Sequence, residues 1–179
     1  MQESLDEMAP DLFKVRAVGD DGAGYRAPVV TEIVGITYRQ LDYWARTDLV
    51  KPSARAATGS GSQRLYDFKD ILVLKVVKRL LDAGISLQNV RVAVDHLRAH
   101  GTAELAATTL FSDGHTIYEC TRDDEVLDLL RGGQGVFGIA VGPTMTDLAG
   151  QISQFPPEAA VTADQGADEL AARRARRAS

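Results

Sequence analysis

A single glycine, Gly35, separates two short stretches of helical periodicity, and this break most constrains what the chain can fold into. Before it, Pro28 suits the first turn of a helix, and the apolar residues that follow recur at helical spacing: Val29, Val30, Ile33 and Val34. After it, Thr37 is suited to cap a second helix, whose apolar side is supplied by Leu41, Tyr43, Trp44 and Ala45. A helix, a glycine turn and a second helix in this spacing predict a helix-turn-helix motif.

A β-hairpin is predicted to follow the second helix. Residues 58–62 are rich in Ser and Gly, and they lie between two short extended arms at residues 51–52 and 63–66. A flexible tip between two such arms is typical of a hairpin. We therefore expect a wing beside the helix-turn-helix.

Two amphipathic helices are predicted after the wing. Asp67 is placed to cap the first, whose apolar stripe is Leu72, Val73, Val76, Val77, Leu80 and Leu81. Gly84 ends that helix, and Ser86 caps a last helix that carries Leu87, Val90, Val94 and Leu97. Residues 25–100 therefore predict a mainly α, winged helix-turn-helix domain.

The sequence changes to a strand pattern between residues 105 and 152. The expected elements are short: strands at 108–111, 116–120 and 136–141, and helices that begin at Thr121 and Pro143. The sequence Ser112-Asp113-Gly114-His115 is a good turn between the first two strands. This zone predicts a small α+β domain that follows the helical one.

The two ends of the chain show no sustained periodicity. Residues 1–24 mix Asp, Glu and Gly, and we expect a flexible arm. Two consecutive prolines, Pro156 and Pro157, halt any helix at the start of residues 153–179, which then become rich in Ala, Asp and Arg. We expect a disordered tail there, with its closing arginines solvated: Arg173, Arg174, Arg176 and Arg177.

The formal charge of −5 is unevenly distributed along the chain. Residues 25–100 carry +5, whereas residues 1–24 carry −4 and residues 101–179 carry −6. Phosphate binding depends on the local density of Lys and Arg. A basic helix-turn-helix between acidic segments is therefore compatible with DNA binding despite the negative total.

Several other classes of protein are disfavoured. No apolar stretch is long enough to cross a bilayer, and residues 1–10 lack the basic start and apolar run of a signal peptide, so we expect a cytoplasmic protein at the nucleoid. Cys120 stands alone, and His96, His100 and His115 have no metal-ligand spacing. The α+β zone offers no nucleophile beside a base. We expect no enzyme, no metal site and no cofactor.

The candidate functional residues lie on the second helix of the motif. An α-helix fits the major groove of DNA, and flanking basic and aromatic side chains contact phosphates. The candidates are Tyr38, Arg39, Asp42, Tyr43 and Arg46. From charge alone, an ordinary solvated face of a small helix explains them as well.

Three motifs resemble the DNA-binding domain of MerR-family regulators over residues 28–98. They are the string ITYRQLDYWARTDLV at 36–50, QRLYDF at 63–68, and AGISLQ at 83–88 at the end of an apolar helix. The resemblance implies a recognition-helix arginine at Arg39, a phosphate-binding tyrosine at Tyr43, and a wing that uses Arg64 and Tyr66. The full expected DNA-binding set is Thr37, Tyr38, Arg39, Asp42, Tyr43, Arg46, Arg64 and Tyr66.

The sequence departs from the family pattern in two ways. Asp42 stands where many members carry an arginine; it cannot bind phosphate, but it can accept a hydrogen bond from cytosine, Arg39 or Arg46. Metal- and redox-sensing members place cysteines at the end of a long dimerisation helix, which is missing here. We expect Cys120 to be a small buried residue in a strand.

The second zone, with TLFSDG at 109–114 and GGQGVFGIAV at 132–141, resembles an actinobacterial branch of the family. In that branch a short α+β domain replaces the effector-binding domain, and the branch is linked to the control of cell-division genes. The glycines after residue 131 follow a helix pattern and precede a strand, so they are expected to stop a helix and not to bind phosphate.

The expected function is that of a homodimeric transcription regulator on a palindromic promoter site. The resemblance implies that it distorts an over-long promoter spacer so that RNA polymerase engages both elements. Apolar residues in 105–152 are expected to hold the dimer together. The alternative is a nucleoid-associated, chromosome-organising protein with little base discrimination.

Overall fold

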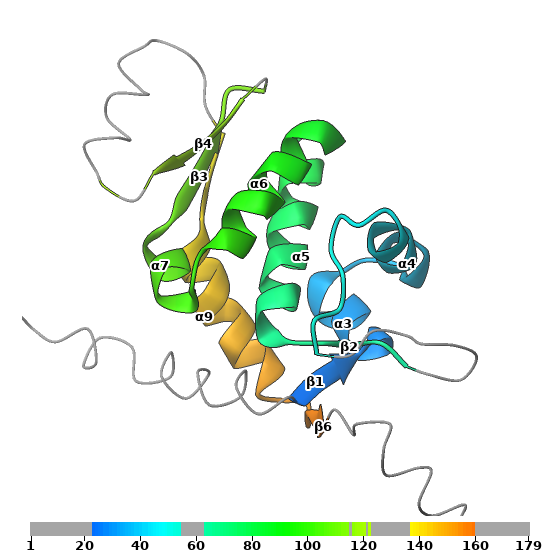
Figure 1. Cartoon of the computed structure of the whole chain (residues 1–179). Coiled ribbons are helices and arrows are strands. Elements are labelled where there is room, and N and C mark those ends of the chain that lie inside the picture. The colour runs from blue at the N-terminus through cyan, green and yellow to red at the C-terminus, as the bar shows by residue number, and fades with distance from the viewer. Residues whose placement is uncertain (1–22, 55–62, 115, 121, 123–136, 160–179) are drawn as a thin grey trace, which may run out of the picture.

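The computed structural model describes residues 23–54, 63–114, 116–120, 122 and 137–159 (Figure 1). The elements are β1 (Ala23–Arg26), α3 (Ala27–Val34), α4 (Tyr38–Arg46), β2 (Leu65–Tyr66), α5 (Phe68–Asp82), α6 (Leu87–Ala99), α7 (Thr102–Ala107), β3 (Thr109–Ser112), β4 (Ile117–Cys120), β5 (Phe137–Ala140), α9 (Val141–Ile152) and β6 (Glu158–Ala159). Helix α5 lies at the centre, and α4 and the sheet of β3 and β4 lie at opposite ends of the molecule (Figure 1). Within these ranges, no helix is both long and apolar enough to cross a membrane.

The predicted helix-turn-helix is present. Gly35 ends α3 in the left-handed conformation, with φ of 75°, and its N–H donates to the carbonyl of Thr31. The Thr37 hydroxyl then accepts from the backbone N–H of Gln40 at 3.2 Å, while the Gln40 side chain accepts from the Thr37 N–H at 2.9 Å. This reciprocal capping box fixes where α4 begins, because it satisfies two backbone donors of its first turn.

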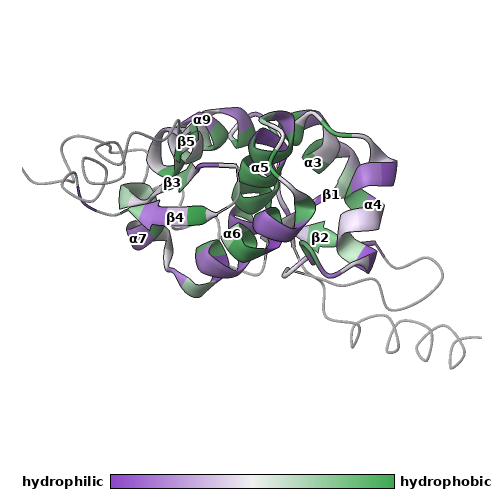
Figure 2. Ribbon diagram, turned by 90° about the horizontal axis from the view of Figure 1, so that it is seen from above, coloured by the Kyte–Doolittle hydropathy of each residue, from purple (hydrophilic) through white to green (hydrophobic). Residues whose placement is uncertain are grey.

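The two long helices also begin where the sequence predicts, and α5 ends where it predicts. Asp67 caps α5 by accepting from the N–H of Asp70 at 2.7 Å. Gly84 follows α5 with a φ of 82°, and Ser86 caps α6 by accepting from the N–H of Asn89 at 3.3 Å. Figure 2 colours most of α5 as hydrophobic, in keeping with its position between the other helices.

The wing differs from the expected hairpin. Among the described residues, β2 does not pair with residues 51–52 but runs antiparallel to β1, with Tyr66 opposite Tyr25 and Leu65 opposite Arg26. Residues 55–62, which include the expected tip, lie outside the described residues. The physical reason for the different pairing is that Pro52 has no N–H to donate to a neighbouring strand. Strand β1 has its backbone donors, and its buried Tyr25 lies opposite the buried Tyr66.

The two ends of the described chain meet in a small sheet of order β2-β1-β6. Strand β6 pairs with β1, and Arg26 Nε lies 2.5 Å from Glu158 Oε2. The sequence assigned Ala23 and Gly24 to a flexible arm and residues 153–159 to a disordered tail, and for these residues the structure differs. Each strand is too short to show a period of its own, and the pairing depends on residues more than 130 positions apart. Residues 1–22 and 160–179 lie outside the described residues.

The second zone has the predicted strands but is packed into the first. Its sheet has the order β4-β3-β5, with β3 antiparallel to both neighbours. Helix α9 packs against α5, α3 and α7, and one hydrophobic cluster runs from Tyr25 to Ile152. Leu110 and Ile139 are buried in that cluster, whereas Phe137 is 41% exposed. That residues 105–152 hold a dimer together stays a prediction. The helix expected from Thr121 lies outside the described residues.

Helix α7 was not predicted from the sequence. It has six residues, which is too few to carry a recognisable apolar stripe. The Glu104 carboxylate accepts from the backbone N–H of Gly101 at 2.8 Å and stabilises its first turn. Helix α7 packs against α9, so it belongs to the same core.

Candidate DNA-binding surface

Helix α4 has one buried side and one exposed side. Leu41, Trp44 and Ala45 are buried in the core, as the sequence predicts. Tyr38 and Tyr43 are 63% and 53% exposed, so Tyr43 belongs to the outer side and not to the apolar side where the sequence also placed it. Much of α4 is hydrophilic and faces outward at one end of the molecule (Figure 2). The side chains on this outer side are therefore accessible to a large partner.

Arg39 is an exposed basic candidate for a base contact. Its side chain is exposed and makes no ion pair or hydrogen bond with any residue that the structure describes. Thr37 differs, because its hydroxyl is already used in capping α4. Guanidinium groups bind guanine and phosphate through paired N–H donors. Arg39 is thus available for such a contact without breaking one to any residue that the structure describes.

Asp42 does not point freely outward as the sequence suggested; it lies between two arginines. Arg46 Nε donates to Asp42 Oδ2 at 2.7 Å, and Arg64 Nη1 donates to Asp42 Oδ1 at 2.8 Å. These charged hydrogen bonds, with that of Arg46 the larger cause, lower the pKa of Asp42 and raise the pKa of both arginines. Of the partners weighed for Asp42, Arg46 is confirmed, Arg39 is not, and Arg64 was missed.

Tyr66 is a core residue. Its side chain is fully buried, and this burial raises its pKa to about 12. A side chain without exposed surface cannot contact a phosphate in this conformation, so the expected DNA contact of Tyr66 is not supported. The short Arg64-Leu65-Tyr66 motif did not reveal this, because only the long-range pairing with β1 shows which side chains face inward.

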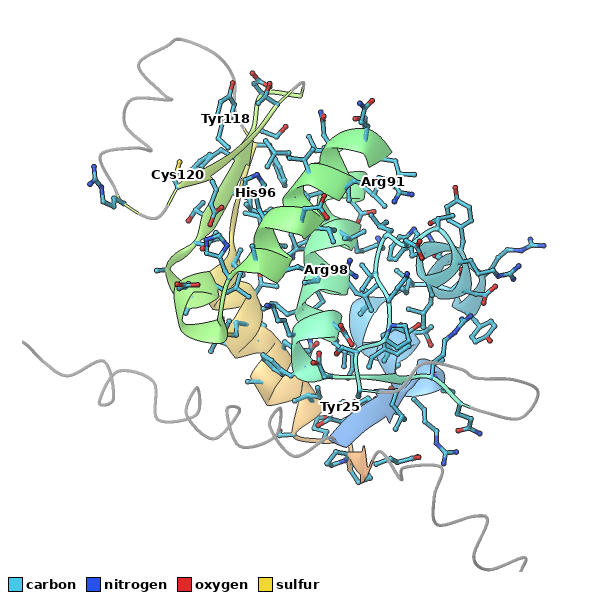
Figure 3. The ribbon with its side chains drawn as sticks, in the orientation of Figure 1. Tyr25, Arg91, His96, Arg98, Tyr118 and Cys120 are labelled. Carbon is cyan, nitrogen blue, oxygen red and sulfur yellow. The ribbon has the colours of Figure 1, made fainter. Side chains whose placement is uncertain are left out.

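Two polar contacts that the sequence did not predict hold α4 and the following loop in place. Arg91 on α6 donates to the carbonyl of Thr47, just after α4, at 3.0 Å (Figure 3). The carboxylate of Asp70 accepts from the N–H and the hydroxyl of Ser53 at 2.7 and 2.8 Å. Burial, with the nearby Asp67 charge, raises the pKa of Asp70 to about 6. These contacts to α5 and α6 therefore hold α4 and the loop after it in a fixed position, with the exposed side of α4 facing outward.

At the other end of the molecule, Glu119 connects the β3–β4 hairpin to α6. Its two carboxylate oxygens lie 3.1 Å from His96 Nδ1 and 3.2 Å from His100 Nε2. Figure 3 places His96 between α6 and β4. A hydrogen bond to the His96 carbonyl raises the pKa of His100. No three or more His, Cys, Asp and Glu residues in the described part of the chain are placed to hold a metal ion.

Comparison with known proteins decides the family. Residues 25–97 match the family model described as the MerR HTH family regulatory protein. Over 171 residues the chain is 63% identical to uncharacterized HTH-type transcriptional regulators of Mycobacterium tuberculosis and Mycobacterium bovis, a match that covers 94% of this chain and 76% of each relative. The chain belongs to the MerR family. It is a helix-turn-helix transcriptional regulator and not an enzyme, and DNA binding follows from that membership.

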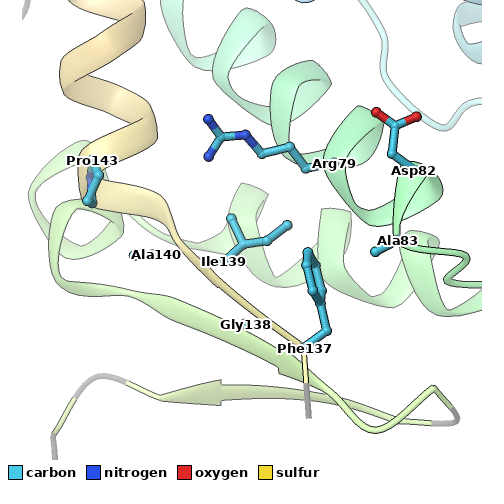
Figure 4. A pocket seen from close by; sticks show the side chains of 8 residues that line it. All are labelled: Arg79, Asp82, Ala83, Phe137, Gly138, Ile139, Ala140 and Pro143. Carbon is cyan, nitrogen blue, oxygen red and sulfur yellow. The ribbon is translucent and has the colours of Figure 1, made fainter.

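This MerR-family regulator also has a hollow far from α4. A cavity of about 480 Å³ lies between the end of α5 and strand β5, and its lining includes Arg79, Phe137, Ile139 and Pro143 (Figure 4). Arg79 donates to the Thr144 hydroxyl at 2.6 Å, so part of the hydrogen-bonding capacity of its guanidinium is already used.

Cys120 is buried in β4, as expected.

Proposed function

We propose that this protein binds double-stranded DNA sequence-specifically, as a homodimer on an inverted repeat in a promoter. The observation that carries the proposal is the outer side of α4, where Arg39, Tyr38 and Tyr43 are exposed on a helix whose other side is locked into the core. A helix presented in this way fits the major groove. Family membership supports the same surface.

Each exposed residue has a distinct proposed role. Arg39 reads a base edge, because its guanidinium has no partner to give up among the described residues. Tyr38 and Tyr43 offer hydroxyls on rigid side chains to phosphates, at little cost in side-chain entropy. Arg46 and Arg64 contact the DNA backbone on either side of the groove, since Arg46 is the last residue of α4 and Arg64 is bound to Asp42 on the same helix.

The dimer, the promoter geometry and RNA polymerase as a partner belong to the same proposal. One α4 helix covers only a half-site, and two copies on a two-fold axis would read an inverted repeat. Bending or untwisting the spacer between promoter elements would let RNA polymerase engage both. Such a protein acts at the nucleoid in the cytoplasm.

Selection from a library of random duplexes tests the proposal. The full chain is incubated with the library, bound duplexes are amplified over several rounds, and sedimentation of the protein with the selected duplex gives the stoichiometry. We expect an inverted repeat bound by two protein chains, and competition by selected but not by shuffled duplex. Failure to enrich any sequence would contradict the proposal and favour a chromosome-organising protein. Enrichment of an asymmetric site by a single chain would contradict the dimer alone.

A further inference from the structure

We propose that Asp42 is a positioning residue for DNA recognition: its carboxylate links Arg64 to Arg46 on α4, so that both arginines meet DNA in one fixed arrangement. This inference rests on the proposed function and adds a determinant of specificity to it. Asp42 itself need not touch DNA.

The geometry of the Asp42 carboxylate supports this role. Its two oxygens are divided between the two arginines, Oδ2 to Arg46 and Oδ1 to Arg64. Arg46 is four residues away on the same helix, but Arg64 is 22 residues away, immediately before β2. The carboxylate therefore connects α4 to the residue that precedes β2.

Burial distinguishes this link from ordinary surface ion pairs. The side chains of Asp42 and Arg64 are 17% and 25% exposed, so water screens their contact only in part. The nearby pair of Asp48 and Lys51 is 67% and 60% exposed and joins residues three positions apart. Exposed pairs of that kind contribute little. Of these two acidic residues, Asp42 on α4 and Asp48 just after it, only Asp42 is placed to set the position of a distant arginine.

The link has a definite consequence for binding. Phosphate contacts fix the register of a protein on the duplex, and a constrained arginine supports fewer registers than a mobile one. With the carboxylate in place, the two arginines and Asp42 carry one net positive charge. Without it, two unconstrained guanidinium groups can bind phosphates of any sequence. Loss of the carboxylate should therefore raise non-specific affinity more than specific affinity.

Asp42→Asn and Asp48→Asn form a matched pair for the test. Each removes one negative charge beside α4 and changes side-chain volume little. Asp48 has a φ of 60°, a conformation that Asn tolerates well. The probes are a duplex selected by the wild-type protein from a random library and a shuffled duplex of equal length. Affinities of the full chain for both are measured over a range of salt concentrations, and circular dichroism checks the fold of each variant.

For Asp42→Asn we expect tighter binding to the shuffled duplex, a salt slope steeper by about one unit, and a selected-to-shuffled affinity ratio lower by about 5-fold or more. Asp48→Asn should leave the ratio unchanged. In a chain that already carries Arg64→Gln, Asp42→Asn should change the ratio much less, since the distant arginine is gone. This double-variant measurement also separates positioning from a general weakening of the fold.

Three results would overturn the inference. The first is an Asp42→Asn variant whose selected-to-shuffled affinity ratio equals that of the wild type. The second is an equal loss of ratio in Asp42→Asn and Asp48→Asn, which would show that only net charge matters. The third is an unchanged effect of Asp42→Asn in the Arg64→Gln chain. Equal binding of both duplexes by the wild-type protein would instead contradict the proposed function, and this inference with it.

Discussion

Truncating Leu148 to alanine should destabilise the whole molecule, including the DNA-binding helices. Leu148 lies on α9, is fully buried, and belongs to the cluster that also contains Trp44 on α4. Removing a buried leucine side chain costs about 2 to 5 kcal/mol in transfer free energy and cavity formation. With a urea m-value of about 2 to 3 kcal/mol per M for a chain of this size, the unfolding midpoint should fall by roughly 0.7 to 2.5 M.

The sequence supplies a local probe for this experiment. Trp44 is the only tryptophan in the chain, so its fluorescence reports on α4 alone. Urea unfolding of the wild type, Leu148→Ala and Thr146→Ala is followed by this signal; Thr146 is exposed on the same helix and serves as the control. We expect the Trp44 midpoint to fall only for Leu148→Ala. An unchanged Trp44 midpoint, with a separate early transition in circular dichroism, would refute the single core and restore two independent domains.

Three further outcomes are expected. Arg64→Ala should weaken binding to selected and shuffled duplexes together and flatten the salt slope by about one unit, as gel-shift titrations at several salt concentrations would show; a change in base preference alone would contradict this. Burial raises the pKa of Asp70 to about 6 from an ordinary 3.8, so its protonated form adds stability that is full below about pH 4 and is lost as pH rises through about 6. The unfolding free energy of the wild type relative to Asp70→Asn, from urea titrations, should therefore fall from pH 4 to about pH 7, and a rise would show the opposite sign. A Cβ on Gly142 would lie 2.3 Å from the carbonyl oxygen of Ala106. Gly142→Ala should therefore lower the free energy of unfolding by about 1 to 3 kcal/mol, and with it the Tm measured by calorimetry. An unchanged Tm would show that α7 and α9 separate freely.

The parts of the fold that depend on local chemistry could be predicted from the sequence. Gly35 and Gly84 adopt the left-handed conformation because glycine has no side chain to oppose it. Thr37 and Asp67 cap helices through hydrogen bonds to residues only three positions later in the sequence. The β3–β4 hairpin follows equally from its turn residues. The pairing of β1 with β2 and β6 could not be predicted, because strands of two to four residues have no period and find their partners through the tertiary fold.

In the candidate site, too, features set by local sequence could be predicted and features set by long-range contacts could not. Helical spacing alone placed Arg39 on the outer side of α4, where the structure has it. It could not show that Tyr66 faces the core, since the two-residue strand β2 has no alternation to read. Nor could it show that Arg64 meets Asp42, because that contact spans 22 positions and depends on where β1 holds β2.

The most direct test of the central claim, that the outer side of α4 reads DNA, compares Arg39→Ala with Arg98→Ala. Both remove an exposed helical arginine, but Arg98 lies on α6, away from the proposed surface. Affinities for the selected duplex are measured by gel-shift titration at fixed salt, with folding checked by circular dichroism. We predict that Arg39→Ala loses about 1 to 3 kcal/mol of specific binding, or roughly 5- to 150-fold, while Arg98→Ala binds as the wild type does. Equal affinities of both variants and the wild type would contradict the claim.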